Sequence, residues 1–316
     1  MRNAFVKALE IQAARDENIF LITGDLGFGV LTDFSAKFPA RFINAGICEQ
    51  NMTAVAAGMA LEGKTVFTYS IANFPTARCL EQIRNDVAYH EANVKIVAVG
   101  AGFSYGALGM THHATEDIAF MRALPKITVL SPCDPLEAEK AAEYAVAAAG
   151  PFYIRLGRGG EPAIHQDRSF SLRRGKALEL KSGTDAAILA TGSIAGEALK
   201  AAAILAERGI SCAVYSFPFV KPLDEELLRR LAAAMPLIVT LEEHTAHGGF
   251  GGAVAEVISG FRARAALTRI GLGDTFSAIV GSQAYLRRAY GLDGESVAKA
   301  ILEAYERERE REGEGI

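Results

Sequence analysis

Short apolar runs alternate with stretches of helical periodicity through most of this chain. The first run, Ile19 to Ile22, closes on the turn-forming pair Gly24-Asp25. Four further strand candidates follow, with helix patterns between them, at Thr65 to Tyr69, Val94 to Val99, Thr128 to Ser131 and Phe152 to Arg155. Strands this apolar are buried on both faces, and strands separated by helices pair in parallel. The pattern predicts a parallel sheet covered by helices on both faces.

A polar stretch from residue 157 to residue 183 separates this unit from a second one with the same alternation. The length of 316 residues, with 50% apolar side chains and 31 glycines, fits about two domains. We therefore expect an α/β protein with two doubly wound domains. The predicted boundaries are a first domain over 1–165, a linker over 166–183, a smaller domain over 184–305 and a charged, frayed helical tail over 306–316.

Composition and charge exclude several classes of protein. No apolar stretch of about 20 residues occurs, and the chain opens directly into an amphipathic helix, so we expect a soluble cytoplasmic protein without a membrane partner. The net charge of −4 argues against a nucleic-acid partner. The four cysteines, Cys48, Cys79, Cys133 and Cys212, form no CxxC pair. We therefore expect buried free thiols, and neither a zinc site nor a disulfide framework.

The strongest functional signal is a carboxylate at the start of an apolar helix. Glu49 precedes the run Met52 to Ala60, which is too apolar to form a surface helix. A carboxylate there is costly unless it is partnered or protonated, and no neutralising side chain lies nearby in the sequence. Glu49 either accepts backbone N–H bonds in the first turn or belongs to a functional site.

The heptapeptide Gly46-Ile47-Cys48-Glu49-Gln50-Asn51-Met52 resembles the signature of the pyrimidine-binding domain of transketolases. The segments Thr111-His112-His113 and Ser131-Pro132-Cys133-Asp134-Pro135 are similar to later motifs of that domain. Ala190-Thr191-Gly192-Ser193, Lys221-Pro222-Leu223-Asp224 and Glu242-Glu243-His244 resemble the mixed-sheet transketolase C-terminal domain. The resemblance covers nearly the whole chain, with its motifs in the family's order.

The resemblance implies thiamine diphosphate as the cofactor. Glu49 matches the glutamate that hydrogen-bonds the aminopyrimidine and favours its imino tautomer, and Phe74 matches the ring that stacks on it. Asp25, Leu26 and Ile47 match other positions near the cofactor. From the residues alone, Asp25 is as readily a helix cap and Phe74 a core aromatic. The family's second aromatic position is Ile71 here, so Tyr69 is an alternative stacking ring.

His112 matches the active-site histidine that lies near donor oxygens and assists proton movement, and His113 is expected behind it. A His-His pair can instead cap a helix or bind a metal, but no carboxylate or cysteine at ligand spacing accompanies it. We therefore assign the catalytic role to Glu49 and His112.

The substrate positions depart from the family pattern. Arg2 and Arg155 match the two arginines that hold a substrate phosphate, with His112 beside them. The family's serine and histidine positions hold Gly29 and Gly100, and its acidic stretch before Thr-His contains Leu108. Loss of a polar contact to a sugar hydroxyl costs about 1 to 3 kcal/mol, so these changes predict an altered substrate.

The second half of a thiamine diphosphate site is missing from the motifs. Gly24 to Gly29 is glycine-rich, but no matching asparagine motif for a divalent cation follows, so we expect no metal site in this chain. A separate N-terminal subunit is expected to hold the diphosphate through Mg²⁺ or Ca²⁺. The chain would then be the C-terminal subunit of a split transketolase, self-associating as a dimer within a heterotetramer.

Three functions compete. The first is transfer of a two-carbon ketol unit between sugars or sugar phosphates, with acetyl transfer from pyruvate to a modified sugar as a variant. The second is the beta subunit of a 2-oxo acid dehydrogenase, which shares the two-domain plan. The third is a non-catalytic interaction module, in which Glu49 and His112 would tolerate substitution. The match around Thr111-His112 and Arg155 favours ketol transfer.

Overall fold

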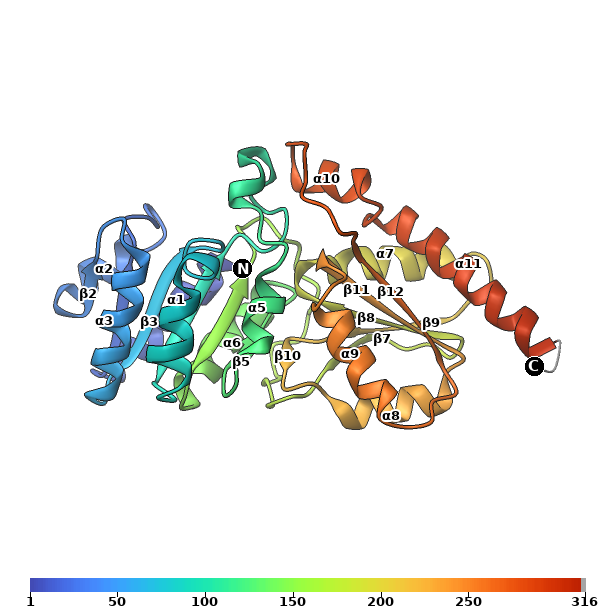
Figure 1. Ribbon diagram of the computed structural model, residues 1–316, viewed down its shortest axis with the longest axis horizontal. Coiled ribbons are helices and arrows are strands. Elements are labelled where there is room, and N and C mark those ends of the chain that lie inside the picture. The colour runs from blue at the N-terminus through green and yellow to red at the C-terminus, as the bar shows by residue number, and fades with distance from the viewer. Residues whose placement is uncertain (314–316) are drawn as a thin grey trace.

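The computed structural model describes residues 1–313. Two α/β units lie side by side, the first coloured blue to green and the second yellow to red (Figure 1). Each has a sheet with helices on both faces, as the alternation of apolar runs predicted. No helix among the described residues is long and apolar enough to cross a membrane.

The first sheet has seven strands in the order β10-β5-β6-β4-β3-β1-β2. All five predicted strands are confirmed to within two residues. The strands are β1 (Ile19–Thr23), β2 (Phe42–Asn44), β3 (Thr65–Ile71), β4 (Val94–Val99), β5 (Thr128–Leu130), β6 (Phe152–Leu156) and β10 (Phe219–Lys221). Every pairing is parallel except that of β10 with β5. The carboxyl ends of β1 to β4 therefore meet at one edge of the sheet.

Helices cover this sheet on both faces and enclose two apolar cores. They are α1 (Arg2–Ala13), α2 (Thr32–Lys37), α3 (Glu49–Leu61), α4 (Leu80–Gln82), α5 (Asp117–Ala123) and α6 (Pro135–Ala147). Helix α1 packs on α6 over one face, and α3 packs on β3 over the other. Met52, Ala56 and Ala57 of α3 are fully buried, which explains why this helix carries so little charge.

The second sheet has five strands in the order β12-β11-β8-β9-β7. They are β7 (Leu178–Lys181), β8 (Ala186–Thr191), β9 (Cys212–Ser216), β11 (Leu237–Thr245) and β12 (Ala266–Leu272). Only β7 runs antiparallel to its neighbour, so the sheet is mixed as expected. Its helices are α7 (Ala195–Ala206), α8 (Glu225–Ala234), α9 (Phe250–Ser259), α10 (Gln283–Ala289) and α11 (Gly294–Gly313).

Three predicted boundaries need correction. Strand β10 belongs to the second unit by sequence but completes the edge of the first sheet. The predicted linker contains β7, so the segment without regular structure is 157–177 instead. The charged stretch from residue 306 continues α11 without a break to Gly313, and residues 314–316 lie outside the described part.

Candidate functional site

Loops after consecutive strands of the first sheet carry four of the predicted site residues. Asp25 follows β1, Glu49 follows β2, Phe74 follows β3 and His112 follows β4. Because these strands are parallel neighbours, the loops gather at one sheet edge, where α/β proteins bind their ligands.

Glu49 is the first residue of α3, and its side chain is 2% exposed. Its Oε2 accepts a hydrogen bond from Nη1 of Arg78 at 2.7 Å. The expectation that nothing neutralises this carboxylate is therefore wrong: the partner comes from a loop 29 residues further along the chain. Gly24, at the end of β1, lies against Glu49, because a Cβ there would be 3.2 Å from the glutamate Cγ.

Arg78 links Glu49 to two aromatic rings. Its guanidinium carbon lies 4.7 Å from the centroid of the Phe74 ring. The Phe74 ring in turn meets the His112 ring edge-on, with centroids 5.3 Å apart. The side-chain amide of Asn73 donates to the carbonyl oxygens of Thr111 and His113, which ties the two loops together. Glu49, Phe74 and His112 therefore lie in one cluster, joined through an arginine that the sequence did not single out.

This cluster suits a flat, hydrogen-bonding heterocycle. The planar guanidinium of Arg78 already lies over the Phe74 ring while donating to Glu49. An aminopyrimidine needs the same two contacts, an aromatic face and a carboxylate at its ring edge. Arg78 is 45% exposed, so it can leave this position for solvent without passing through the core.

The other predicted cofactor contacts have different environments. Asp25 is exposed and left-handed, at φ 56°, and exchanges two hydrogen bonds with Asn44. It caps no helix, because α2 begins only at Thr32. Leu26 is partly buried, and Ile47 is 78% exposed.

Tyr69 is 2% exposed within the core, so it is not a second stacking ring. His113 is also buried: its Nε2 lies 3.2 Å from the carbonyl oxygen of Gly106, and its ring packs edge-on against Phe103. His112, by contrast, is partly exposed and has Nδ1 3.0 Å from the Thr111 hydroxyl. Only the first histidine of the pair faces the cluster.

A second group of polar residues surrounds Tyr105. Nη1 of Arg2 lies 3.5 Å from the Tyr105 hydroxyl, and the guanidinium carbon of Arg158 lies 5.3 Å from the centroid of the ring. The ring occupies the space beside Gly100, where an added Cβ would lie 2.4 Å from Cδ2 of Tyr105. Sequence reasoning missed Tyr105 and Arg158, although a second arginine directly after β6 was a usable signal. Leu108 is 55% exposed nearby in the chain.

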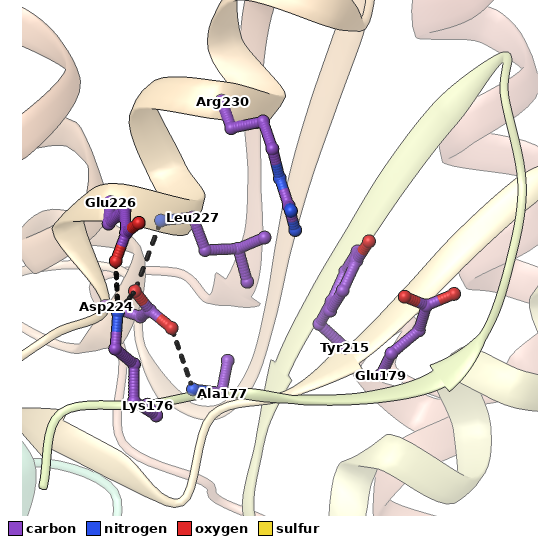
Figure 2. A pocket seen from close by; sticks show the side chains of 8 residues that line it. All are labelled: Lys176, Ala177, Glu179, Tyr215, Asp224, Glu226, Leu227 and Arg230. Carbon is purple, nitrogen blue, oxygen red and sulfur yellow. Dashed lines mark hydrogen bonds and ion pairs between the residues drawn. The ribbon is translucent and has the colours of Figure 1, made fainter. Parts of the chain in front are cut away.

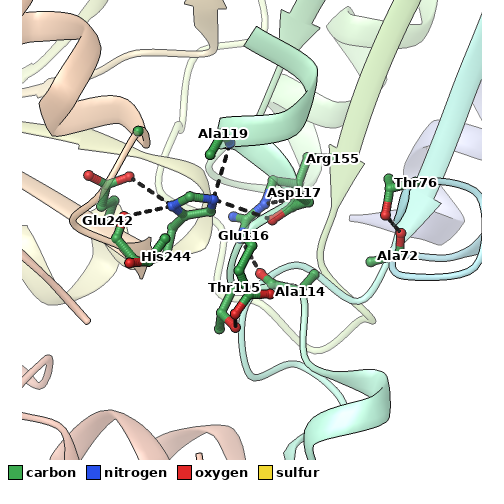
Figure 3. A network of polar contacts seen from close by, with 12 residues as sticks. Ala72, Thr76, Ala114, Thr115, Glu116, Asp117, Ala119, Arg155, Glu242 and His244 are labelled. Atoms are coloured by element: carbon green, nitrogen blue, oxygen red, sulfur yellow. Dashed lines mark hydrogen bonds and ion pairs between the residues drawn. The ribbon is translucent and has the colours of Figure 1, made fainter. Parts of the chain in front are cut away.

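Arg155 does not join either group. It is 2% exposed in β6, and its Nε donates to Asp117 at 2.7 Å (Figure 3). Its Nη2 donates to the carbonyl oxygens of Ala114 and Glu243, so the side chain connects the two units. The geometry contradicts the prediction that Arg155 holds a substrate phosphate, because this guanidinium is committed to buried acceptors.

The same junction holds two titratable side chains of β11. Burial raises the pKa of Glu242 to about 7, although the backbone N–H groups of Gly251 and Phe250 donate to it. Burial lowers the pKa of His244 to about 4, against the opposing effect of Asp117. The His244 ring lies between these carboxylates, with Nδ1 3.6 Å from Glu242 and Nε2 3.9 Å from Asp117 (Figure 3).

A surface pocket of about 330 Å³ lies in the second unit, between β7 and α8 (Figure 2). Its charged side chains largely satisfy one another, since Lys176 pairs with Asp224 at 3.1 Å and with Glu226 at 2.6 Å. None of the predicted site residues lines it. We therefore place the functional site at the strand ends of the first sheet.

The fold and the cluster are those of a thiamine diphosphate-dependent enzyme half. The family model of the transketolase pyrimidine binding domain matches residues 1–161, and that of the transketolase C-terminal domain matches residues 175–297. The chain belongs to the transketolase family, whose members use thiamine diphosphate.

Similar proteins of the same length exist as separate subunits. One of the two subunits of an apulose-4-phosphate transketolase from Phocaeicola vulgatus is 37% identical over 96% of each chain. A 6-deoxy-6-sulfo-D-fructose transketolase subunit from a Clostridium species is 38% identical, over 98% of this chain and 96% of that one. A solved structure described as a split gene transketolase, inactive beta4 tetramer, is 37% identical with a TM-score of 0.87, covering 96% and 97%. Transketolase-like subunits of this length are therefore found encoded apart from the rest of the enzyme.

Proposed function

We propose that this chain is the C-terminal subunit of a split transketolase, active in transferring a two-carbon ketol unit between sugars or sugar phosphates. The observation that carries the proposal is the cluster of Glu49, Phe74 and His112 at one edge of the first sheet. The relatives support a split enzyme, because the chain covers nearly the whole of subunits named as transketolase parts.

The residues of the cluster divide the work of holding the cofactor's pyrimidine. Glu49 would hydrogen-bond the edge of the pyrimidine, and Phe74 would stack on its face after Arg78 withdraws. When bound, thiamine diphosphate supplies the carbanion and electron sink for carbon–carbon cleavage. His112 is partly exposed beside Phe74, where it can exchange a proton with a donor or acceptor hydroxyl.

The substrate end of the site would be built by Arg2, Arg158 and Tyr105. The two arginines flank one ring and can bind an anionic group such as a sugar phosphate. Tyr105 beside Gly100 and the exposed Leu108 would set which sugar is accepted. Arg155 is not part of this proposal, because its guanidinium is buried in the junction.

The diphosphate and its Mg²⁺ or Ca²⁺ would be held by a separate N-terminal subunit in a heterotetramer. The cluster here offers one buried carboxylate, and Arg78 already pairs with it, so it does not resemble a site for a divalent cation and diphosphate. The isolated chain should then be inactive and bind thiamine diphosphate weakly. Tight, metal-dependent binding by this chain alone would contradict the split arrangement.

The deciding experiment is a coupled assay of this chain with its candidate partner, thiamine diphosphate and Mg²⁺. Xylulose 5-phosphate, fructose 6-phosphate and pyruvate would be tested as donors, each with an aldose acceptor. Ketose-dependent turnover that requires both chains supports the proposal. Release of carbon dioxide from pyruvate without ketose turnover would replace it with acetyl transfer, and reduction of a lipoyl acceptor would replace it with a 2-oxo acid dehydrogenase.

A further inference from the structure

Three metal-binding side chains converge away from the cluster, where the segment 157–177 crosses the start of α6. Cys133 lies just before α6, Glu137 lies in its first turn, and His165 lies in the crossing segment. Sγ of Cys133 is 3.9 Å from Nε2 of His165, and the same nitrogen is 2.9 Å from Oε1 of Glu137. The three donor atoms all lie within 4.8 Å of one another. Among the described residues, this is the one such group of three.

The spacing of these atoms is close to that around a tetrahedral ion. A metal bound at about 2.3 Å from sulfur and about 2.0 to 2.1 Å from nitrogen and oxygen keeps those ligands about 3.3 to 3.6 Å apart. The two observed separations of 3.9 and 2.9 Å lie on either side of this range. An ion would therefore draw the thiolate closer and separate the imidazole from the carboxylate, each by less than about 1 Å.

We propose that Cys133, Glu137 and His165 bind one zinc ion, with a water molecule as the fourth ligand. Thiolate and imidazole donors select a borderline-soft cation, whereas Mg²⁺ and Ca²⁺ take oxygen ligands. One thiolate and one carboxylate balance the charge of a divalent ion, which matters because Cys133 and Glu137 are 1% and 0% exposed. The His165 side chain is 13% exposed and leaves a path for the ion and the water.

The backbone holds the ligands in place before any ion binds. The amide of Cys133 donates to Oε2 of Glu137 at 2.7 Å, which leaves Oε1 directed at His165. Asp134 caps α6 by accepting from the amide of Glu137, and its second oxygen accepts from the amides of Ile164 and His165. Such outer contacts orient metal ligands and sustain affinity. All three ligands are therefore fixed by one aspartate and one helix turn.

The site would anchor the connection between the two units. His165 lies in a segment of about 20 residues without regular structure, and long segments of this kind are usually either functional or mobile. Bound zinc would tie this segment to α6 of the first unit. The inference does not rest on the proposed transketolase activity, because the ligands lie apart from Glu49, Phe74 and His112. It differs from the sequence expectation of a simple buried thiol because His165 is distant in sequence.

The test uses the untagged, full-length chain after chelator treatment, with its fold checked by circular dichroism. Titration with Co²⁺ should give a thiolate-to-cobalt charge-transfer band that saturates at one ion per chain, and Zn²⁺ should abolish the band by displacing Co²⁺. Cys133→Ser should remove the band. His165→Ala, which changes a partly exposed side chain, should weaken Co²⁺ binding at least about tenfold, the lower limit seen even for outer contacts.

Two matched variants serve as controls. Cys212→Ser removes another buried free thiol, and His112→Ala removes a histidine from the cluster at the strand ends. Both should keep the band and its stoichiometry. The proposal is overturned if no stoichiometric Co²⁺ binds, if the band survives Cys133→Ser, or if His112→Ala abolishes it. In the first of these outcomes, Glu137 and His165 form only an ion pair beside a thiol.

A second measurement tests the anchoring role without a spectroscopic signal. Limited trypsin digestion should cut at Arg168, Arg173 or Arg174 in the crossing segment. Zn²⁺ should slow this cleavage at least about tenfold in the native chain and leave it unchanged in His165→Ala, as expected for a ligand whose loss weakens the site. Equal protection of both chains by Zn²⁺ would contradict the site.

Discussion

Glu49 has a partner that can be exchanged, and this distinguishes it from a structural buried acid. A buried carboxylate without any partner would be strongly destabilising, so the chain alone needs Arg78 beside it. Arg78, however, is 45% exposed and comes from a surface loop, so its pairing with Glu49 contributes at most about 1 kcal/mol. Exchange of the arginine for a ligand with the same two contacts therefore requires little reorganisation.

Glu49→Gln should abolish turnover in the reconstituted enzyme and leave the fold intact. The swap conserves volume but removes the ionisable group that favours the reactive tautomer, and loss of such a group costs about 10²- to 10⁴-fold in rate. The free energy of unfolding should change by no more than about 1 kcal/mol, since only an exposed partner is lost. Steady-state rates and urea denaturation check both points. Full turnover in this variant would instead support the non-catalytic interaction module.

Arg78→Met should strengthen binding of thiamine diphosphate to the reconstituted enzyme. The arginine must give up an ion pair of about 0 to 1 kcal/mol and a ring contact of about 0.5 to 1 kcal/mol before the pyrimidine enters. Removing this competition should lower the dissociation constant by up to about 30-fold, measured by calorimetry. Arg84→Met, at another exposed arginine of the following helix, should have no effect. Weaker binding in Arg78→Met would show that the guanidinium stays in contact with the bound cofactor.

At the scale of elements, local patterns predicted the strands but not the exchange of strands between units. The five strands of the first unit follow from their apolar residues, because each is buried from both sides. Strand β10 is three residues long and pairs with β5 from the far unit, so its position depends on docking rather than on its own sequence. The pairing of Arg155 with Asp117 was missed for the same reason: both residues gain their roles only when the junction closes.

Strand β11 should carry two opposing pH dependences that only variants separate. The folded pKa of Glu242 is raised from 4.5 to about 7, so its favourable contribution is full below pH 4.5 and is lost as the pH rises to 7. The folded pKa of His244 is lowered from 6.5 to about 4, so stability from this group falls as the pH drops from 6.5 to 4. The two slopes have opposite signs and nearly cancel between pH 4.5 and 6.5.

His244→Gln should therefore lose stability relative to the native chain as the pH rises from 4.5 to 6.5, and Glu242→Gln should gain it. Each relative change should approach about 3 kcal/mol at most, since one pKa unit corresponds to about 1.4 kcal/mol. Thermal midpoints across this pH range, taken as variant minus native chain, remove the contribution of other carboxylates. Slopes of the same sign in both variants would contradict the assignment.

At the scale of the whole molecule, the sequence predicted the fold and most of the cluster, while contacts between distant loops escaped it. Glu49, Phe74 and His112 were found because each belongs to a local motif. Arg78, Tyr105 and Arg158 were not, because their roles come from contacts with other loops: Arg78 with Glu49, and Arg158 with Tyr105. The Cys133, Glu137 and His165 group is a further case, since its third member lies 28 residues beyond the second.

The loops at the cluster also expose apolar side chains that the chain alone does not cover. Phe28 is 84% exposed after β1, and Ile47 is 78% exposed directly before α3. Large apolar side chains next to a functional site are typical of a surface that another chain buries. We expect the N-terminal subunit to cover them, because the diphosphate half of the cofactor must reach the cluster from outside this chain.

Phe28→Ser should therefore weaken assembly with the N-terminal subunit without changing the fold of this chain. Burial of a phenylalanine contributes about 1.5 to 3 kcal/mol, which corresponds to about 10- to 150-fold in the dissociation constant. Light scattering of the mixed subunits measures the assembly, and circular dichroism of the single chain reports its fold. Phe276→Ser, at a 66% exposed phenylalanine of the second unit, is the control and should assemble normally. Equal weakening by both variants would place the partner on a broader surface, and no weakening by Phe28→Ser would move it away from the cluster.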